Sequence, residues 1–227
     1  MVDTPTIAVR GEAALEMPPE LARFTVTVAA RDKDRAAALS RLTGRTAAIR
    51  AVLDGYAAAV ERRETGAVQV RPELRRSGER VAAYAASLTT VVTVTDFTVL
   101  GELLLRLADE DQTSVYGPSW ELRRDSPVHR EARRAAVADA VVRAREYAEA
   151  VGATLVRLIT LTDAGMSGGQ PVHLAYSGMA LRDKAGGGPD FDLEPQQQTV
   201  HASVEMRFAI TEALPAEMSR APGAGDS

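Results

Sequence analysis

The sequence predicts an α+β protein: an antiparallel sheet in a split β-α-β-β-α-β order with helices on one face, followed by a C-terminal helix and two strands. From residue 21 to residue 123, the apolar spacing changes between the strand period of two and the helical period in that order. Apolar residues make up 45% of the chain, which is enough for a globular core. Aromatic residues are only 4%, so we expect a core of Ala, Val and Leu.

The N-terminal region is predicted to contain two strands. Residues 7–13 indicate a short strand, and Pro18-Pro19 marks a turn after it. Residues 21–30 alternate cleanly, so that one face of the strand is apolar and the other carries Arg and Thr. Asp32 or Asp34 can then cap a helix, because a short acidic side chain accepts hydrogen bonds from free amides in the first turn.

A helix and a hairpin are predicted next. The apolar residues from Leu42 to Val60 fall near a single helical stripe, and Gly66 then permits the chain to turn. A strand begins at Val68 and stops near Pro72. Ser77-Gly78 is predicted to be the turn of a hairpin.

The second half of the sheet follows the hairpin. Residues 81–95 form a long alternating strand with one apolar face and one face rich in Thr. We expect that Thr-rich face to be covered by the last helix and strands or by another subunit. Asp96 is a good cap for a short helix with leucines at i, i+3 and i+4 spacing. Residues 113–123 return as a strand, and strict alternation places Tyr116 and Trp120 on one face.

The C-terminal part is predicted to add a helix and two strands. The helix covers residues 127–151 and ends at Gly152, and the strands are residues 155–162 and 199–210. The Gly-rich connection over residues 164–195 is long enough to suggest a flexible loop.

We expect a single domain over residues 1–212 that could subdivide near residue 124, with a disordered tail over residues 213–227. The chain has no Cys, which excludes disulfides, thiolate metal sites and cysteine nucleophiles. A net charge of -4 gives no overall attraction to nucleic acid or anionic lipid. No export signal and no membrane span is visible in the sequence, so the expected location is the cytoplasm.

Several segments together resemble the SIMPL family, also called domain of unknown function 541. The resemblance covers residues 6–211 and rests on an ordered set of turn and small-residue motifs. They are Val9-Arg10-Gly11-Glu12-Ala13, Pro19-Glu20-Leu21-Ala22, Val70-Arg71-Pro72 with Tyr84, Gly117-Pro118-Ser119-Trp120, the Ala-rich stretch from Glu131 to Ala140, and Tyr147-Ala148-Glu149-Ala150-Val151-Gly152.

The resemblance implies an α+β fold, no established catalytic activity and a tendency to form oligomers. Many relatives are exported to the cell envelope, whereas this sequence shows no export signal. The family supplies no agreed catalytic residues, so none is transferred to this chain.

The sequence contains no recognised motif for nucleophilic catalysis, phosphate binding, dinucleotide binding or a zinc protease. A metal site would have to combine His173 and His201 with Asp190 or Asp192, but their separations show no ligand spacing. Solvated histidines are the favoured interpretation, and we predict neither a metal nor a cofactor.

Charged clusters have equally simple interpretations. The carboxylates at residues 109–111 are expected to be solvated caps and turns. Four arginines, Arg71, Arg75, Arg76 and Arg80, could contact phosphates, but acidic residues lie among them and aromatic residues do not, so no nucleic-acid partner is predicted.

The candidate contact residues for a protein partner are apolar. They are Tyr176, Met179 and Leu181 in the Gly-rich connection and Trp120, the only Trp of the chain. The first function hypothesis is a non-enzymatic, homo-oligomeric scaffold or protein-interaction protein. The alternative is a small-ligand-binding protein or an enzyme with a cleft under residues 164–195.

Overall fold

The computed structural model describes residues 4–75, 78, 80–163 and 193–212. The fold is α+β, as the sequence predicts, and the described residues form two compact units. The four-stranded unit contains β2 (Leu21–Asp32), α1 (Arg35–Gly55), β3 (Val60–Leu74), β4 (Val81–Val94), the short 3-10 helix η1 (Phe97–Val99), α2 (Leu100–Ala108) and β5 (Thr113–Glu121). The three-stranded unit contains β1 (Thr6–Met17), α3 (Pro127–Ala150), β6 (Leu155–Asp163) and β7 (Gln198–Ile210).

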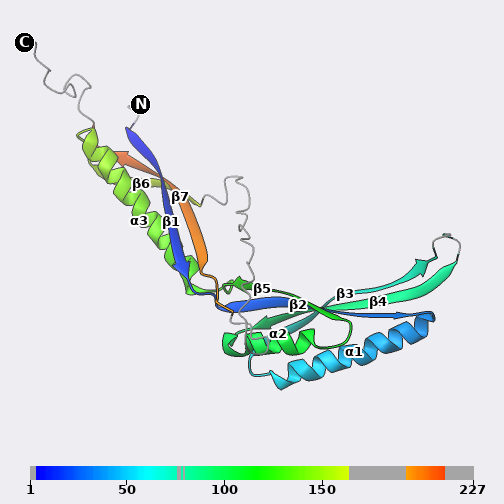
Figure 1. Ribbon diagram of the computed structural model, residues 1–227. Helices are drawn as coiled ribbons and strands as arrows, with labels where there is room; N and C mark the ends of the chain where they lie inside the picture. Colours follow the sequence, from blue (N-terminus) through cyan, green and yellow to red (C-terminus); the bar gives the residue numbers. More distant parts are fainter. Residues whose placement is uncertain (1–3, 76–77, 79, 164–192, 213–227) are drawn as a thin grey trace, which may run out of the picture. The chain divides into compact units, whose positions relative to one another are not determined.

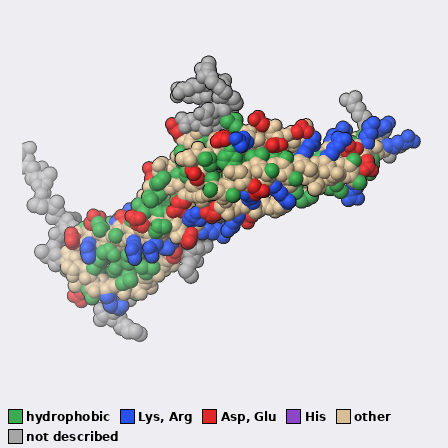
Figure 2. Space-filling view, turned by 90° about the horizontal axis from the view of Figure 1, so that it is seen from below, with side chains coloured by type: hydrophobic (Ala, Val, Ile, Leu, Met, Phe, Trp, Pro, Cys, Tyr) green, Lys and Arg blue, Asp and Glu red, His purple; other side chains and the backbone are tan. Residues whose placement is uncertain are grey.

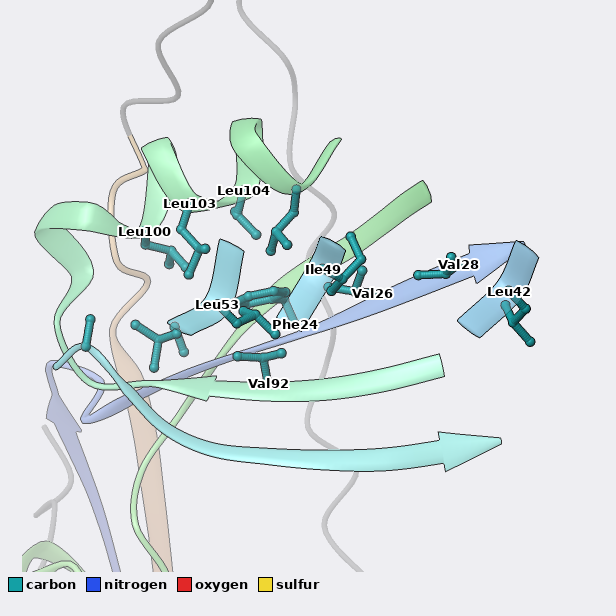
Figure 3. Packing of buried hydrophobic residues seen from close by; sticks show 14 of the residues in the cluster. Phe24, Val26, Val28, Leu42, Ile49, Leu53, Val92, Leu100, Leu103 and Leu104 are labelled. Carbon is teal, nitrogen blue, oxygen red and sulfur yellow. The ribbon is translucent and has the colours of Figure 1, made fainter. Parts of the chain in front are cut away.

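The four-stranded unit is an antiparallel sheet in the order β3-β4-β2-β5 with helices α1 and α2 on one side (Figure 1). Its core lies between that side of the sheet and the helices. Figure 3 shows Phe24 of β2 beneath Leu53 of α1 and the leucines of α2. These side chains are almost completely removed from solvent. Full burial of each large apolar side chain contributes about 1.5–3 kcal/mol.

Two helix starts follow the predicted capping. The Asp34 carboxylate accepts a hydrogen bond from the amide of Ala37 at 2.8 Å, so Asp34 is the N-cap of α1. Asp96 caps η1 by accepting from the amide of Thr98 at 3.0 Å, and α2 continues directly from that turn. Local chemistry is sufficient for these ends, because the capping group and the free amide lie within three residues.

The boundary between α1 and β3 was predicted wrongly. The helix ends at Gly55, and Val60 is paired with Val94 of β4 instead of continuing the helical stripe. Gly66 is not a turn either, because it lies inside β3 at a shift in register between Thr65 and Val68. Residues 56–59 could extend a helix by composition, so the pairing of β3 with β4 overrides local propensity.

The prediction that Tyr116 and Trp120 share a face of β5 was also wrong. Trp120 pairs with Ala22 on the helix side of the sheet, whereas Tyr116 pairs with Thr25 on the opposite side. Between them, Gly117 and Pro118 stand opposite the single residue Phe24. This bulge reverses the alternation of the strand, so Tyr116 is 73% exposed.

The three-stranded unit has its own sheet, in the order β1-β7-β6. The sequence had indicated one sheet extended by the last two strands, so this division is a correction. Strand β7 runs antiparallel to both neighbours: Ile210 donates to the carbonyl of Pro5, and Leu158 pairs with Phe208. Because β1 finds its hydrogen-bond partner at the other end of the sequence, nothing local to either strand predicts the pairing.

Helix α3 packs closely on β1 (Figure 1). Its buried residues recur every four positions, and all of them after Val128 are small, namely Ala132, Ala136, Ala140, Ala144 and Ala148. Opposite them lies Gly11 of β1, whose missing side chain lets the two backbones approach. A Cβ at Gly11 would lie 2.1 Å from the carbonyl oxygen of Ala136 and 2.6 Å from the Cβ of Ala140.

The width of a helix relative to the spacing of the strands determines which strands stay exposed. Neighbouring strands are about 4.8 Å apart and a helix with its side chains is about 10 Å wide, so one helix covers roughly two strands. In the three-stranded unit, the core beneath α3 is made of β1 and β7, and most of β6 lies outside it. In the four-stranded unit, α1 packs on β2 and β4 and α2 packs on β5, which leaves most side chains of β3 exposed.

We expect the substitution Gly11→Ala to destabilise the protein by about 1–3 kcal/mol, because the added methyl group meets backbone atoms that cannot move aside. The matched control is Gly44→Ala in α1, where a Cβ meets no atom within 4 Å and should stabilise the helix by about 0.5–1 kcal/mol. Denaturant titrations of both variants measure the two changes. A Gly11→Ala variant as stable as the original chain would contradict the close approach of β1 and α3.

Candidate functional site

The partner-contact residues predicted from the sequence are only partly placed. Tyr176, Met179 and Leu181 lie outside the described residues. Trp120 is half-buried in the four-stranded unit, where its ring meets the ring of Phe97 edge-on with the centroids 4.9 Å apart. The indole is therefore fixed by core packing, and its contact with a partner stays a prediction.

Titratable groups do not gather into a metal site in the described part of the chain. No group of three or more His, Asp or Glu side chains there could hold an ion. His201 is an exposed residue of β7, whereas His173, Asp190 and Asp192 lie outside the described ranges. The ligand cleft considered under residues 164–195 also falls mostly outside them.

Four carboxylates have a pKa below the usual range because hydrogen-bond donors hold them ionised. The pKa of Asp32 is lowered first by the amide of Asp34, and that of Asp96 by the hydroxyl of Thr98. The guanidinium of Arg123 lowers the pKa of Glu61, and the amide of Glu12 lowers the pKa of Asp139. A general acid at neutral pH needs the opposite shift, so these groups are suited to structural roles.

One of the acidic residues after α2, Asp111, also has a structural partner. Asp111 forms an ion pair with Arg45 of α1, which also donates to the carbonyl of Ala29 at 2.8 Å. This contact joins α1 to the β2 strand and to the turn before β5. It agrees with the interpretation of residues 109–111 as caps and turns.

The side of the four-stranded sheet away from α1 and α2 carries small polar residues. Thr25, Thr27 and Thr89 are half-buried, and the hydroxyls of Thr27 and Thr89 lie 3.3 Å apart. Tyr116 projects from the same side because of the bulge in β5. Cover of this face by another subunit stays a prediction.

The most distinctive surface is a row of apolar side chains on the edge strand β6. Its members, with their exposed fractions, are Val156 (60%), Leu158 (44%), Ile159 (38%) and Leu161 (50%), hereafter the β6 row. Leu158 and Leu161 pair with Phe208 and Met206, whose side chains are buried beneath α3. Leu158 and Leu161 therefore continue an apolar sheet face past the edge of its helix, and Val156 and Ile159 stand beside them at two shifts in register.

The β6 row was missed by the sequence analysis. Residues 155–162 were predicted as a largely apolar strand, and a long apolar strand indicates burial on both sides. The order β1-β7-β6 instead places this strand at an edge, beyond the width of α3. The composition of the strand was visible in the sequence, but its position in the sheet was not.

The model of the SIMPL family, described as a protein of unknown function (DUF541), matches residues 7–208, in agreement with the resemblance seen in the sequence. A search of curated proteins found no match to this chain. Within the ranges that the structure describes, no helix has the length and apolarity needed to cross a membrane.

The lowered pKa of Asp139 makes a pH dependence of stability testable. Asp139 accepts from the amide of Glu12 at 2.9 Å and from Arg143, which ties α3 to β1. Because the pKa in the folded state lies below the unfolded value of about 3.8, this contribution is complete above pH 3.8 and is lost as the pH falls through the folded-state pKa.

We therefore expect Asp139→Asn to be less stable than the original chain near neutral pH, with the difference shrinking below about pH 3.8. Glu146→Gln on the same helix is the control, since Glu146 is exposed and has no ion pair in the described part of the chain. Thermal unfolding between pH 2.5 and 7, about the range over which Asp titrates, gives the comparison. A constant difference across that range would exclude the titration of Asp139 as its cause.

Proposed function

The chain belongs to the SIMPL family, and we propose that it is a non-enzymatic interaction protein that assembles with other copies of itself into a discrete oligomer. The observation that supports this proposal best is the exposed β6 row. Four neighbouring apolar side chains on an edge strand are a surface that water covers poorly and a protein partner covers well.

The energetics favour covering the β6 row. Complete burial of a Val, Leu or Ile side chain contributes about 1.5–3 kcal/mol, and these four side chains are about half exposed. Covering all four would therefore contribute roughly 3–6 kcal/mol before the entropic cost of association. The row can anchor an interface, but a stable oligomer needs additional contact area around it.

The local geometry indicates contact through side chains instead of an extended sheet. Strand β6 has two shifts in register against β7, one between Leu155 and Arg157 and one between Leu158 and Thr160. Such bulges twist an edge strand and interrupt its free hydrogen-bonding groups, which disfavours pairing with another strand. The apolar side chains stay available for packing.

A second copy of the chain is the simplest partner for this surface. In a two-fold contact, the same patch meets itself, so an apolar row without a dominant charge is self-complementary. The β6 row satisfies that requirement, since its four members are Val, Leu and Ile. The four carboxylates with lowered pKa values engage in backbone hydrogen bonds, caps and ion pairs, which supports a role in binding and not in catalysis.

We expect Leu161→Lys to weaken the oligomer by about a hundredfold or more, because a two-fold contact brings the two introduced charges together and like charges cost several kcal/mol. Val142→Lys on α3 is the matched control, since Val142 is also 50% exposed but lies outside β6. Sedimentation velocity over a concentration series measures the association of both variants and of the original chain.

A strictly monomeric original chain at high concentration would overturn the proposal. An oligomer that survives Leu161→Lys and dissociates on Val142→Lys would place the interface on α3 instead. Circular dichroism confirms that both variants remain folded, as expected for substitutions at half-exposed positions.

A further inference from the structure

The far ends of β3 and β4 extend beyond the rest of their sheet. Strand β2 ends at Asp32, which pairs with Tyr84 of β4. Tyr84 pairs on its other side with Pro72 of β3, so these three residues lie at the same level of the sheet. Past that level, β3 and β4 pair only with each other, up to the pair Leu74 and Val81. Figure 1 shows this hairpin curving away from α1. Its side chains are therefore more accessible than those of the three- and four-strand part of the sheet.

Cationic side chains predominate on this extension and immediately before it. Arg71, Arg75 and Arg80 are exposed, and none has an ion pair with another described residue. The nearby Glu73 is already held by Arg31 at 2.7 Å. Figure 2 shows Lys and Arg side chains gathered at the right of the view, over the far ends of β3 and β4.

The acidic residues where β2 meets α1 are also engaged. Asp32 binds Arg41 at 2.9 Å, and Asp34 caps α1. Arg76 and Glu79 fall outside the described residues and contribute one charge of each sign to the sequence. The extension thus keeps a local excess of positive charge, although the whole chain carries -4. At physiological salt the Debye length is about 8 Å, so a partner at the hairpin responds to these local charges.

Exposed aliphatic side chains accompany the arginines. Val68 is 58% exposed, Leu74 57% and Val81 44%. Leu74 and Val81 pair with each other at the end of the extension, whereas Val68 lies before the extension and on the opposite side of the sheet from Arg71. The end of the hairpin therefore offers three cations and two aliphatic groups, hereafter the hairpin tip: Arg71, Arg75, Arg80, Leu74 and Val81.

We propose that the hairpin tip binds the surface of an anionic lipid bilayer. The arginines would face lipid phosphates and anionic headgroups, and the aliphatic side chains would enter the boundary between headgroups and acyl chains. Nucleic acid is the less suitable partner, because its bases are bound by aromatic stacking and the exposed apolar side chains of the hairpin tip are aliphatic. This role is independent of self-association through the β6 row.

The test is flotation of the full chain with vesicles. One set contains phosphatidylcholine alone, and the other contains equal parts of phosphatidylcholine and phosphatidylglycerol. The chain should bind only the anionic vesicles, and high salt should weaken the binding. Because each cation near an anionic surface strengthens binding about fivefold, the variant R71Q/R75Q/R80Q should bind roughly a hundredfold more weakly.

Two further variants make the result specific. L74T/V81T retains β-forming residues and all charges, and it should bind several-fold more weakly if the aliphatic groups enter the lipid. R130Q/R133Q/R134Q removes three exposed arginines of α3 and is the matched control for charge, so its binding should be unchanged. Circular dichroism checks the folding of each variant.

Several outcomes would overturn the proposal. They are no binding of the original chain to anionic vesicles, full binding by R71Q/R75Q/R80Q, full binding by L74T/V81T, or equal losses in the α3 control. If the original chain bound a DNA duplex but no vesicles, the arginines would be assigned to nucleic-acid binding instead.

Discussion

The limited width of a helix is the constraint on which the exposed surfaces of this protein depend. One helix covers roughly two strands, whereas α3 has a three-stranded sheet beneath it. The close contact of Gly11 with Ala136 and Ala140 fixes α3 over β1, and the buried side chains of β7 complete that core. Most of strand β6 is therefore left without a covering helix. The same limit leaves β3 outside the cover of α1 and α2 in the four-stranded unit.

The two uncovered strands have different chemistry, and this difference separates the two proposed roles. Strand β6 exposes Val, Leu and Ile side chains beside an already apolar sheet face, which suits a second protein surface of the same kind. The extension of β3 and β4 combines aliphatic groups with arginines that have no ion pair to another described residue. This combination suits a lipid surface with anionic headgroups over an apolar interior. Edge strands are aggregation hazards in general. The bulges of β6, and Pro72 and the charges of β3, restrict uncontrolled pairing at both edges.

Features that depend on neighbouring residues were predictable. The caps at Asp34 and Asp96 join groups within three positions, and the alternation of β2 identifies Phe24 and its neighbours as core. Family membership was also visible, because an ordered set of turn and small-residue motifs survives over most of the chain. The candidate site was not predictable to the same extent. The apolar character of residues 155–162 was clear, but exposure depends on which strands and helices lie beside them.

The sequence by itself determined the secondary structure classes, the helix caps, the apolar faces of most strands and the family. Only the tertiary structure decided that β1 pairs with β7, that Val60 begins a strand, and that Tyr116 and Trp120 face opposite sides of one sheet. The physical reason is the range of the forces involved. Capping and periodicity act within one or two turns of chain, whereas strand pairing, bulges and helix cover depend on hydrogen bonds and packing between segments far apart in sequence.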